Sequence, residues 1–300
     1  MKTSAIFLGL CSLVWIALGG LAAADSDSDV PIPASYEQIT FTEKHDADPS
    51  VSQDGKWIAF ASDRTGNYDL YVRELAGQGE TQKTFHSKHD RHPSWSGTDL
   101  VYESNRTGSW DLFKMDTKQG QGELQWSSSP GTEAYASIGP NGKLLFNSAP
   151  KKGLNLSFVK KDMDISVAQD SPNQATVIAK GIDPRWSPDG GKVVFSSRRT
   201  KNSDIWIVSA DGGATTQMTT DRAHDLNPCF SPDGKRIVFC SKRAGNYDLW
   251  MMNADGSGKT QLTTHPKDET SPFWAVDGKI YFVLAEKTGT TNIYVIKAPK

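Results

Sequence analysis

One sequence pattern recurs six times along this 300-residue chain, about every 44 residues. The two fullest copies read DADPSVSQDGKWIAFASDRTGNYDLYV, from residue 46, and DLNPCFSPDGKRIVFCSKRAGNYDLWM, from residue 225. Aligned on the proline near their start, the six copies place Pro49, Pro93, Ala136, Pro184, Pro228 and Pro272 in register, at intervals of 44, 43, 48, 44 and 44 residues. A fixed period of this size is typical of a repeat protein, in which each copy is one structural unit.

Each copy contains four short strand-like runs, which we name strands a to d. In the fifth copy they span residues 228–231, 236–241, 247–253 and 260–263, and Pro, Gly, Asn and Asp residues separate them as turns. No stretch after residue 30 shows a convincing helical period. Four antiparallel strands at this period form one blade of a β-propeller. The sequence therefore predicts an all-β fold, a six-bladed β-propeller of four-stranded antiparallel blades.

The two ends of the repeat array complement each other. The sixth copy supplies strands a to c at 271–275, 279–284 and 292–297, and the sequence reaches Lys300 without a strand d. Residues 38–41 (QITF) precede the first copy as residues 261–264 (QLTT) precede the sixth. We therefore expect the N-terminal strand to close the last blade, which would leave no open sheet edge.

The segment before the repeats has the composition of an export signal. Residues 1–24 carry Lys2, then a long apolar run, then Ala22–Ala24, and we predict a cleaved signal peptide. The length of the run leaves an uncleaved membrane anchor open. Residues 25–35 are predicted to be an acidic linker and residues 36–300 the propeller, with no further domain. We expect a periplasmic or secreted monomer that does not insert into the membrane after cleavage. The formal charge of −2 gives no indication of nucleic-acid binding.

Two cysteines remain after the predicted cleavage, Cys229 and Cys240, on adjacent strands of one repeat. An oxidising compartment would permit a disulfide between them. We favour two buried thiols instead, because small residues such as Ser50 and Ala61 occupy the equivalent places in the first repeat. The third repeat is irregular: Ala136 replaces the proline, and residues 160–173 are expected to form a long connection between strands c and d.

The run SPDGKRIVFCSKRAGNYDLWMMNADGSGKTQLT (231–263) resembles the WD40-like PD40 repeat of TolB-like β-propellers. TolB is the periplasmic component of the Tol–Pal envelope system, and similar repeats occur in prolyl-oligopeptidase-type peptidases and in some oligogalacturonate lyases. The resemblance covers roughly residues 36–300. It implies the propeller but specifies function poorly. The α/β domain of TolB and the hydrolase domain of the peptidases have no counterpart in the sequence, which also lacks G-x-S-x-G.

Residues that recur in most repeats are expected to build the blade, whereas polar residues confined to a few repeats are better functional candidates. The recurring Asp69, Asp111, Asp204 and Asp248, with Asn155 and Asn292 in the other copies, fall in the first class, as do Arg64, Arg106, Arg199 and Arg243. The loops before strand a supply the second class. These partner-binding candidates are His45, Asp46, His89, Asp90, Arg91, His92, His224, Asp225, Asp268 and Glu269.

Three roles for these loop residues stay open at this stage: bracing of loops between blades, a rim that contacts a partner, and a metal or catalytic cluster. We predict a non-catalytic module of the cell envelope that binds a protein or peptide, with no catalytic residue and no cofactor. The alternative is a metal-dependent lyase of the oligogalacturonate type, using a divalent cation held by a histidine-rich channel mouth. No metal ligands are assigned.

Overall fold

The computed structural model describes residues 32–33, 35–77, 79–118, 122–150, 162–286 and 289–299. The predicted signal peptide lies outside these residues, as does most of the predicted linker. Within the described part of the chain, no helix is long and apolar enough to cross a bilayer.

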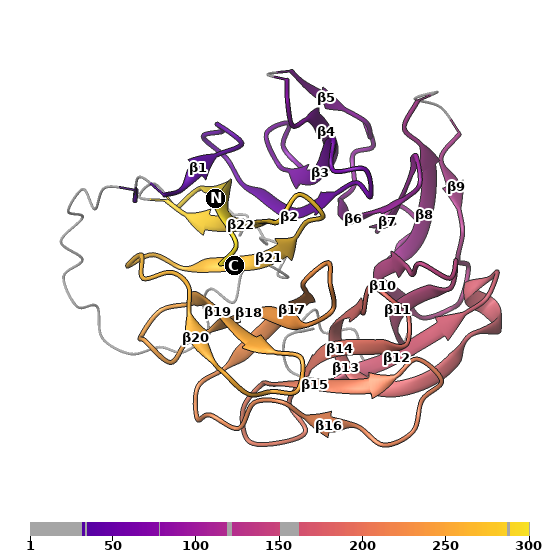
Figure 1. The fold of residues 1–300 in the computed structure, drawn as a ribbon. Helices are drawn as coiled ribbons and strands as arrows, with labels where there is room; N and C mark the ends of the chain where they lie inside the picture. The colour runs from indigo at the N-terminus through magenta and orange to yellow at the C-terminus, as the bar shows by residue number, and fades with distance from the viewer. Residues whose placement is uncertain are drawn as a thin grey trace, which may run out of the picture.

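The described chain folds into antiparallel β-sheets arranged around a central axis (Figure 1). Three sheets follow the predicted order along the chain. They contain β2 (Asp46–Val51), β3 (Trp57–Ser62), β4 (Asp69–Glu74) and β5 (Glu80–Gln82); β6 (Asp90–Ser96), β7 (Asp99–Ser104), β8 (Asp111–Asp116) and β9 (Leu124–Gln125); and β17 (Asp225–Phe230), β18 (Arg236–Ser241), β19 (Asp248–Asn253) and β20 (Thr260–Gln261).

A fourth sheet joins the two ends of the repeat array. Its order is β1 (Glu37–Gln38), β23 (Thr291–Lys297), β22 (Lys279–Ala285) and β21 (Glu269–Trp274). Glu37 lies opposite Val295 and Gln38 opposite Tyr294, in antiparallel register. The backbone N–H of Ile39 then donates to the carbonyl of Ile293 at 2.8 Å. The predicted closure by an N-terminal strand is confirmed, with the strand one residue earlier and shorter than expected.

The remaining strands form one continuous sheet of seven. They are β10 (Thr132–Ile138), β11 (Leu144–Ala149), β12 (Met163–Ala168), β13 (Thr176–Trp186), β14 (Lys192–Ser197), β15 (Asp204–Ser209) and β16 (Thr216–Gln217), with a short 3-10 turn, η2 (Pro172–Gln174), before β13. The first part of β13 pairs with β12 up to Gly181, and the rest pairs with β14 from Ile182. Four sheets are thus separate four-stranded blades, not the six that the sequence predicted.

The merger has a simple cause. Between β5 and β6 seven residues form a loop, whereas no loop residue separates the two halves of β13. The third repeat also differs from its prediction, because residues 163–168 are not part of a c-to-d loop but strand c itself. Met163, Ile165 and Val167 of this strand are buried. Asp164 lies opposite Ser148 as Asp69 lies opposite Ser62, so Asp164 occupies the place given to Asn155, which lies outside the described residues.

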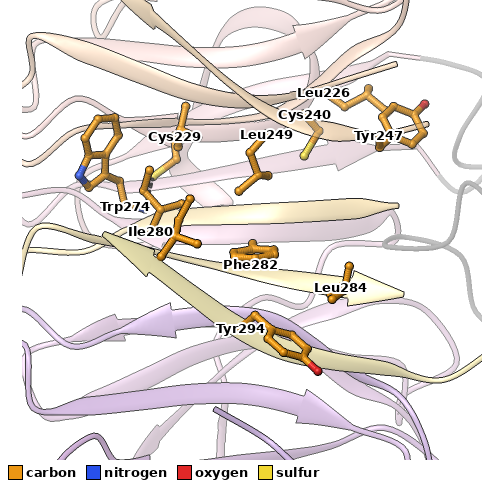
Figure 2. Close-up of a cluster of buried hydrophobic side chains, with 12 residues drawn as sticks. Leu226, Cys229, Cys240, Tyr247, Leu249, Trp274, Ile280, Phe282, Leu284 and Tyr294 are labelled. Atoms are coloured by element: carbon orange, nitrogen blue, oxygen red, sulfur yellow. Dashed lines mark hydrogen bonds between the residues drawn. The ribbon is translucent and has the colours of Figure 1, made fainter. Parts of the chain in front are cut away.

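Apolar contacts between neighbouring sheets form the core. Figure 2 shows one such cluster, in which Leu226, Cys240 and Leu249 face Phe282 and Leu284 of the next sheet. Cys229 and Cys240 are both free and buried, as the sequence analysis predicted. They are not opposite each other in the sheet, because Cys229 pairs with Val238 and Cys240 with Leu226. The innermost strands β2, β6, β10, β13, β17 and β21 each contact the next, and β21 contacts β2, which closes the ring.

Candidate functional site: the central pocket

Some of the predicted partner-binding candidates are acids that lie three residues before the aligned proline, and the structure buries them inside the blades. Asp46, Asp90 and Asp225 have no solvent exposure. Arg64, Arg106 and Arg243 pair with them at 3.1, 2.9 and 2.7 Å, respectively. Burial raises the pKa of all three carboxyls, although the arginines and neighbouring serine hydroxyls oppose this. These pairs brace the start of strand a in three of the repeats.

These three arginines and Arg199, their counterpart in the fourth repeat, each stack on an aromatic ring seven residues further on. Their guanidinium carbons lie 4.4 to 4.7 Å from the ring centroids of Tyr71, Phe113, Trp206 and Trp250. A planar guanidinium can stack and form ion pairs at once. The recurrence of these arginines is therefore explained by blade structure, as the sequence predicted.

Glu269 occupies the acidic position of the sixth repeat with a different partner. Its side chain is fully buried and accepts a hydrogen bond from the hydroxyl of Tyr36 at 2.5 Å. Burial is the main cause that raises the pKa of Glu269 to about 7. Tyr36 directly precedes β1, so this contact connects the N-terminal segment to the last sheet.

The candidates that directly precede these acids lie in the loops between consecutive repeats. His89 and His224 accept backbone N–H groups from Tyr68 and Ser203 through Nδ1, both at 3.2 Å. Asp268 accepts the N–H of Tyr247 in the same way at 2.8 Å. The Nδ1 of the fourth member, His45, is buried and has no partner among the described residues. His89 and His224 therefore lie in contacts between consecutive repeats, whereas His45 makes no such contact through Nδ1. These three histidines do not meet in a metal-binding cluster among the described residues.

A different set of residues meets at the axis. One residue before the aligned position, every repeat places a non-glycine residue with φ between 47° and 55°: Asp48, His92, Tyr135, Asp183, Asn227 and Ser271. Each lies where the a–b pairing slips by a β-bulge. Bulges redirect side chains, and left-handed non-glycine residues are uncommon and concentrate at functional sites. We call these six residues the axial ring.

All six axial-ring residues line one pocket, together with Arg185 and prolines 49 and 272. The empty space around these residues is about 330 Å³ with open solvent included, and its enclosed part has room for only about one water molecule. Of the loop candidates, only His92 belongs to this lining. The other five ring residues were missed by sequence reasoning. The available signal was positional: the residue before the aligned position is polar in every repeat, and five residue types occur among the six repeats.

One half of the pocket is a buried charge network. Protonated His92 donates from Nδ1 to Glu103 at 2.7 Å and from Nε2 to Asp48 at 3.2 Å. Arg91 also approaches Asp48, at 3.4 Å. Burial alone would lower the pKa of His92, but the carboxylates of Asp48 and Glu103 raise it to about 9. Burial would raise the pKa of Asp48, and His92 and Arg91 reverse this and hold it well below its usual range.

This network joins three repeats. Asp48, from the first repeat, also accepts the backbone N–H of His92 in the second, at 3.4 Å. Glu103, from the second repeat, accepts the N–H of Tyr135 in the third, at 3.0 Å. The rings of His92 and Tyr135 lie 4.3 Å apart. This half of the pocket is therefore held rigidly by bonds that its residues make to one another.

The other half has fewer internal bonds. Asn227 donates to Asp183 at 2.7 Å, and Arg185 lies 3.6 Å from the other oxygen of that carboxylate. Asn227, Ser271 and Arg185 are partly exposed. Polar groups that face a pocket with unused hydrogen-bonding capacity can bind a ligand. Within the described ranges, no group of three or more His, Cys, Asp or Glu residues is arranged to hold a metal ion.

The sequence matches the TolB β-propeller domain family over residues 33–173 and 156–300. The chain belongs to this family. Among solved structures it is similar to TolB from Acinetobacter baumannii, with a TM-score of 0.64, 18% identity, and coverage of 82% of this chain and 64% of that one. A putative TolB from Agrobacterium tumefaciens gives a TM-score of 0.63 at 20% identity, over 86% of this chain and 92% of that one.

An oligogalacturonate lyase in complex with manganese is also similar, with a TM-score of 0.59 at 15% identity, over 89% of this chain and 91% of that one. A search of curated proteins gives no significant match. At these identities the structural likeness shows the fold alone. This chain spans less than two thirds of the A. baumannii TolB chain.

Proposed function

We propose that this TolB-like propeller is an exported, non-catalytic module that binds a protein or peptide partner of the cell envelope at its central pocket. The observation that carries the proposal is the axial ring. Six polar residues, at one repeat position and in a strained backbone conformation, line a single pocket. A blade does not require this variety of side chains, since the bracing positions around the ring keep similar residues from repeat to repeat.

We further propose that the seven-stranded sheet acts as two blades, which makes the ring functionally six-bladed. The change of partner along β13 between Gly181 and Ile182 supports this division. The occurrence of one left-handed residue per repeat also supports it. A six-fold ring would bring side chains from every repeat to one axis, so a bound segment could contact several repeats at once.

Export to the periplasm or beyond is part of the proposal. It rests on the apolar run before Ala22–Ala24 and on the resemblance to periplasmic TolB. The second candidate function, a metal-dependent lyase, draws support from the likeness to the manganese-bound oligogalacturonate lyase. We place it second because two of the histidines that suggested it, His89 and His224, accept backbone N–H groups in loops between repeats.

Capture from envelope extracts tests the binding function. The bait is residues 25–300, either wild type or carrying Asn227→Gly and Ser271→Gly. Both residues have positive φ, which glycine adopts without strain, so the double variant removes pocket side chains while the fold is kept. Thr264→Gly, on an exposed loop away from the pocket lining, is the control.

We expect the double variant to lose a partner that wild type and control retain, with similar melting temperatures for all three. Equal capture by all three proteins would refute the pocket as the binding site. Stoichiometric manganese in the wild type, together with cleavage of polygalacturonate, would favour the lyase.

A further inference from the structure

Arg185 is unusual at its place in the repeat. The residue directly after the aligned position is Ser50, Ser94, Ser137, Arg185, Cys229 or Phe273 in the six repeats. Five repeats thus build this part of strand a with an uncharged residue. A long cationic side chain is therefore not required for the blade, and it needs an explanation of its own.

The guanidinium of Arg185 forms one ion pair, with Asp183, and no hydrogen bond among the described residues. Its side chain is 28% exposed and lines the pocket. Among the residues that the structure describes, its partner is Asp183, at 3.6 Å, which is longer than a hydrogen bond. Asp183 in turn accepts a shorter bond from Asn227. A guanidinium carries five N–H donors in a fork that matches a carboxylate, so most of its donor capacity remains available.

The other two cations of the pocket region differ from Arg185. Arg91 and His92 have side chains 3% and 7% exposed, and both lie against Asp48. Their charge is already matched within the network. Positive charge that a ligand could reach is thus concentrated at Arg185, beside the partly exposed Asn227 and Ser271.

We propose that Arg185 is the specificity-determining residue of the pocket and binds one carboxylate of an acidic peptide segment of the partner. This inference rests on the proposed binding function and adds the chemistry of the ligand. A single reachable cation fits a peptide with one acidic group. An oligouronate presents a carboxylate on every sugar and would need several such cations.

A peptide array supplies the test. Acetylated nine-residue peptides of random sequence are displayed in two sets, one amidated at the C-terminus and one with a free carboxylate. They are probed with residues 25–300 as wild type, as Arg185→Ser, and as the control Arg222→Ser, an exposed arginine in the loop before β17. The amidated set reports side-chain carboxylates, and the second set adds the terminal one.

We expect the wild type and the control to require one carboxylate in every peptide that they bind. It is either the side chain of Asp or Glu, or the free C-terminus. Replacing that carboxylate by an amide should weaken binding to the wild type about 10- to 100-fold, the range for a charge-assisted contact. The same replacement should have little effect on Arg185→Ser. Arg185→Glu should recover binding to peptides that carry Lys instead, which a folding defect would not produce.

Peptides that bind without a required carboxylate would overturn the inference but leave the binding function in place. Failure of both peptides and envelope proteins to bind the wild type would overturn the binding function and the inference with it. Arg185-dependent binding of trigalacturonate, without any acidic peptide, would overturn the assignment to a peptide.

Discussion

The charge network around His92 makes the stability of the protein depend on pH in a defined direction. A His pKa that is raised on folding contributes stability that is complete below its unfolded value and is lost as pH rises through the folded value. For His92 the window extends from about 6.5 to about 9. Each unit of pKa difference corresponds to about 1.4 kcal/mol, so the whole contribution is about 3 kcal/mol.

The perturbation is His92→Gln, which keeps a polar side chain but removes the titrating charge. The free energy of unfolding of both proteins is measured by urea denaturation with tryptophan fluorescence from pH 6.5 to 10. Backbone strain at φ 47° is common to both proteins and does not titrate. Other groups, such as the buried tyrosines and cysteines, largely cancel in the difference between the two proteins.

We expect the wild type to be the more stable protein near pH 6.5, and its advantage to shrink by about 3 kcal/mol by pH 10. A difference that stays constant across this range would show that His92 is neutral in the folded protein. The argument that Asp48 and Glu103 hold its proton would then be wrong.

Three further predictions concern closure by the N-terminal strand, the bracing ion pair and export. Deleting residues 36–42 removes β1 and the Tyr36–Glu269 contact, and should lower the melting temperature by well over 5 °C; unchanged melting would contradict closure by this strand. Arg243→Gln leaves Asp225 buried without its cation and should cost about 3 kcal/mol. The repeat of Arg199 has Gly181 in place of the acid, so Arg199→Gln should cost only about 1 kcal/mol of unfolding free energy in the urea assay. Equal losses for the two variants would refute the bracing role of the ion pair. Mass spectrometry of the exported protein should find Asp25 at the N-terminus, and retention of residues 1–24 would favour the anchor.

The features that the sequence predicted well are those set by local chemistry. The period, the turn residues and the match of residues 38–41 to strand d were sufficient to predict the propeller and its closure. The merger of strands in β13 was hidden, because an alignment on prolines does not show where a loop is missing. Strand c of the third repeat was misplaced for a related reason, since the preceding segment shifts its position relative to the other copies.

The site was harder to predict because residue type was a misleading guide. His89 and His224 attracted attention as rare side chains that can ligate metals, yet each accepts a backbone N–H of the preceding repeat. The axial ring contains Asp, His, Tyr, Asn and Ser, which no single chemical motif connects. Only the bulge in strand a brings these side chains into one pocket, and that geometry depends on pairing with strand b.

In strand a, the bracing acid and the side chain that faces the axis are two residues apart. The acid at its start is buried and held by an arginine in three repeats, by serine hydroxyls at Glu133 and by Tyr36 at Glu269. Two residues later, the bulge turns a side chain toward the axis. Since the bracing acid and the apolar contacts between sheets lie outside the axial ring, ring residues that make few bonds to one another can change without unfolding a blade. In the His92 half, by contrast, a ring residue is itself part of the bracing, and substitution there should cost stability. Ligand chemistry in this propeller is therefore expected to vary mainly through Arg185, Asn227 and Ser271.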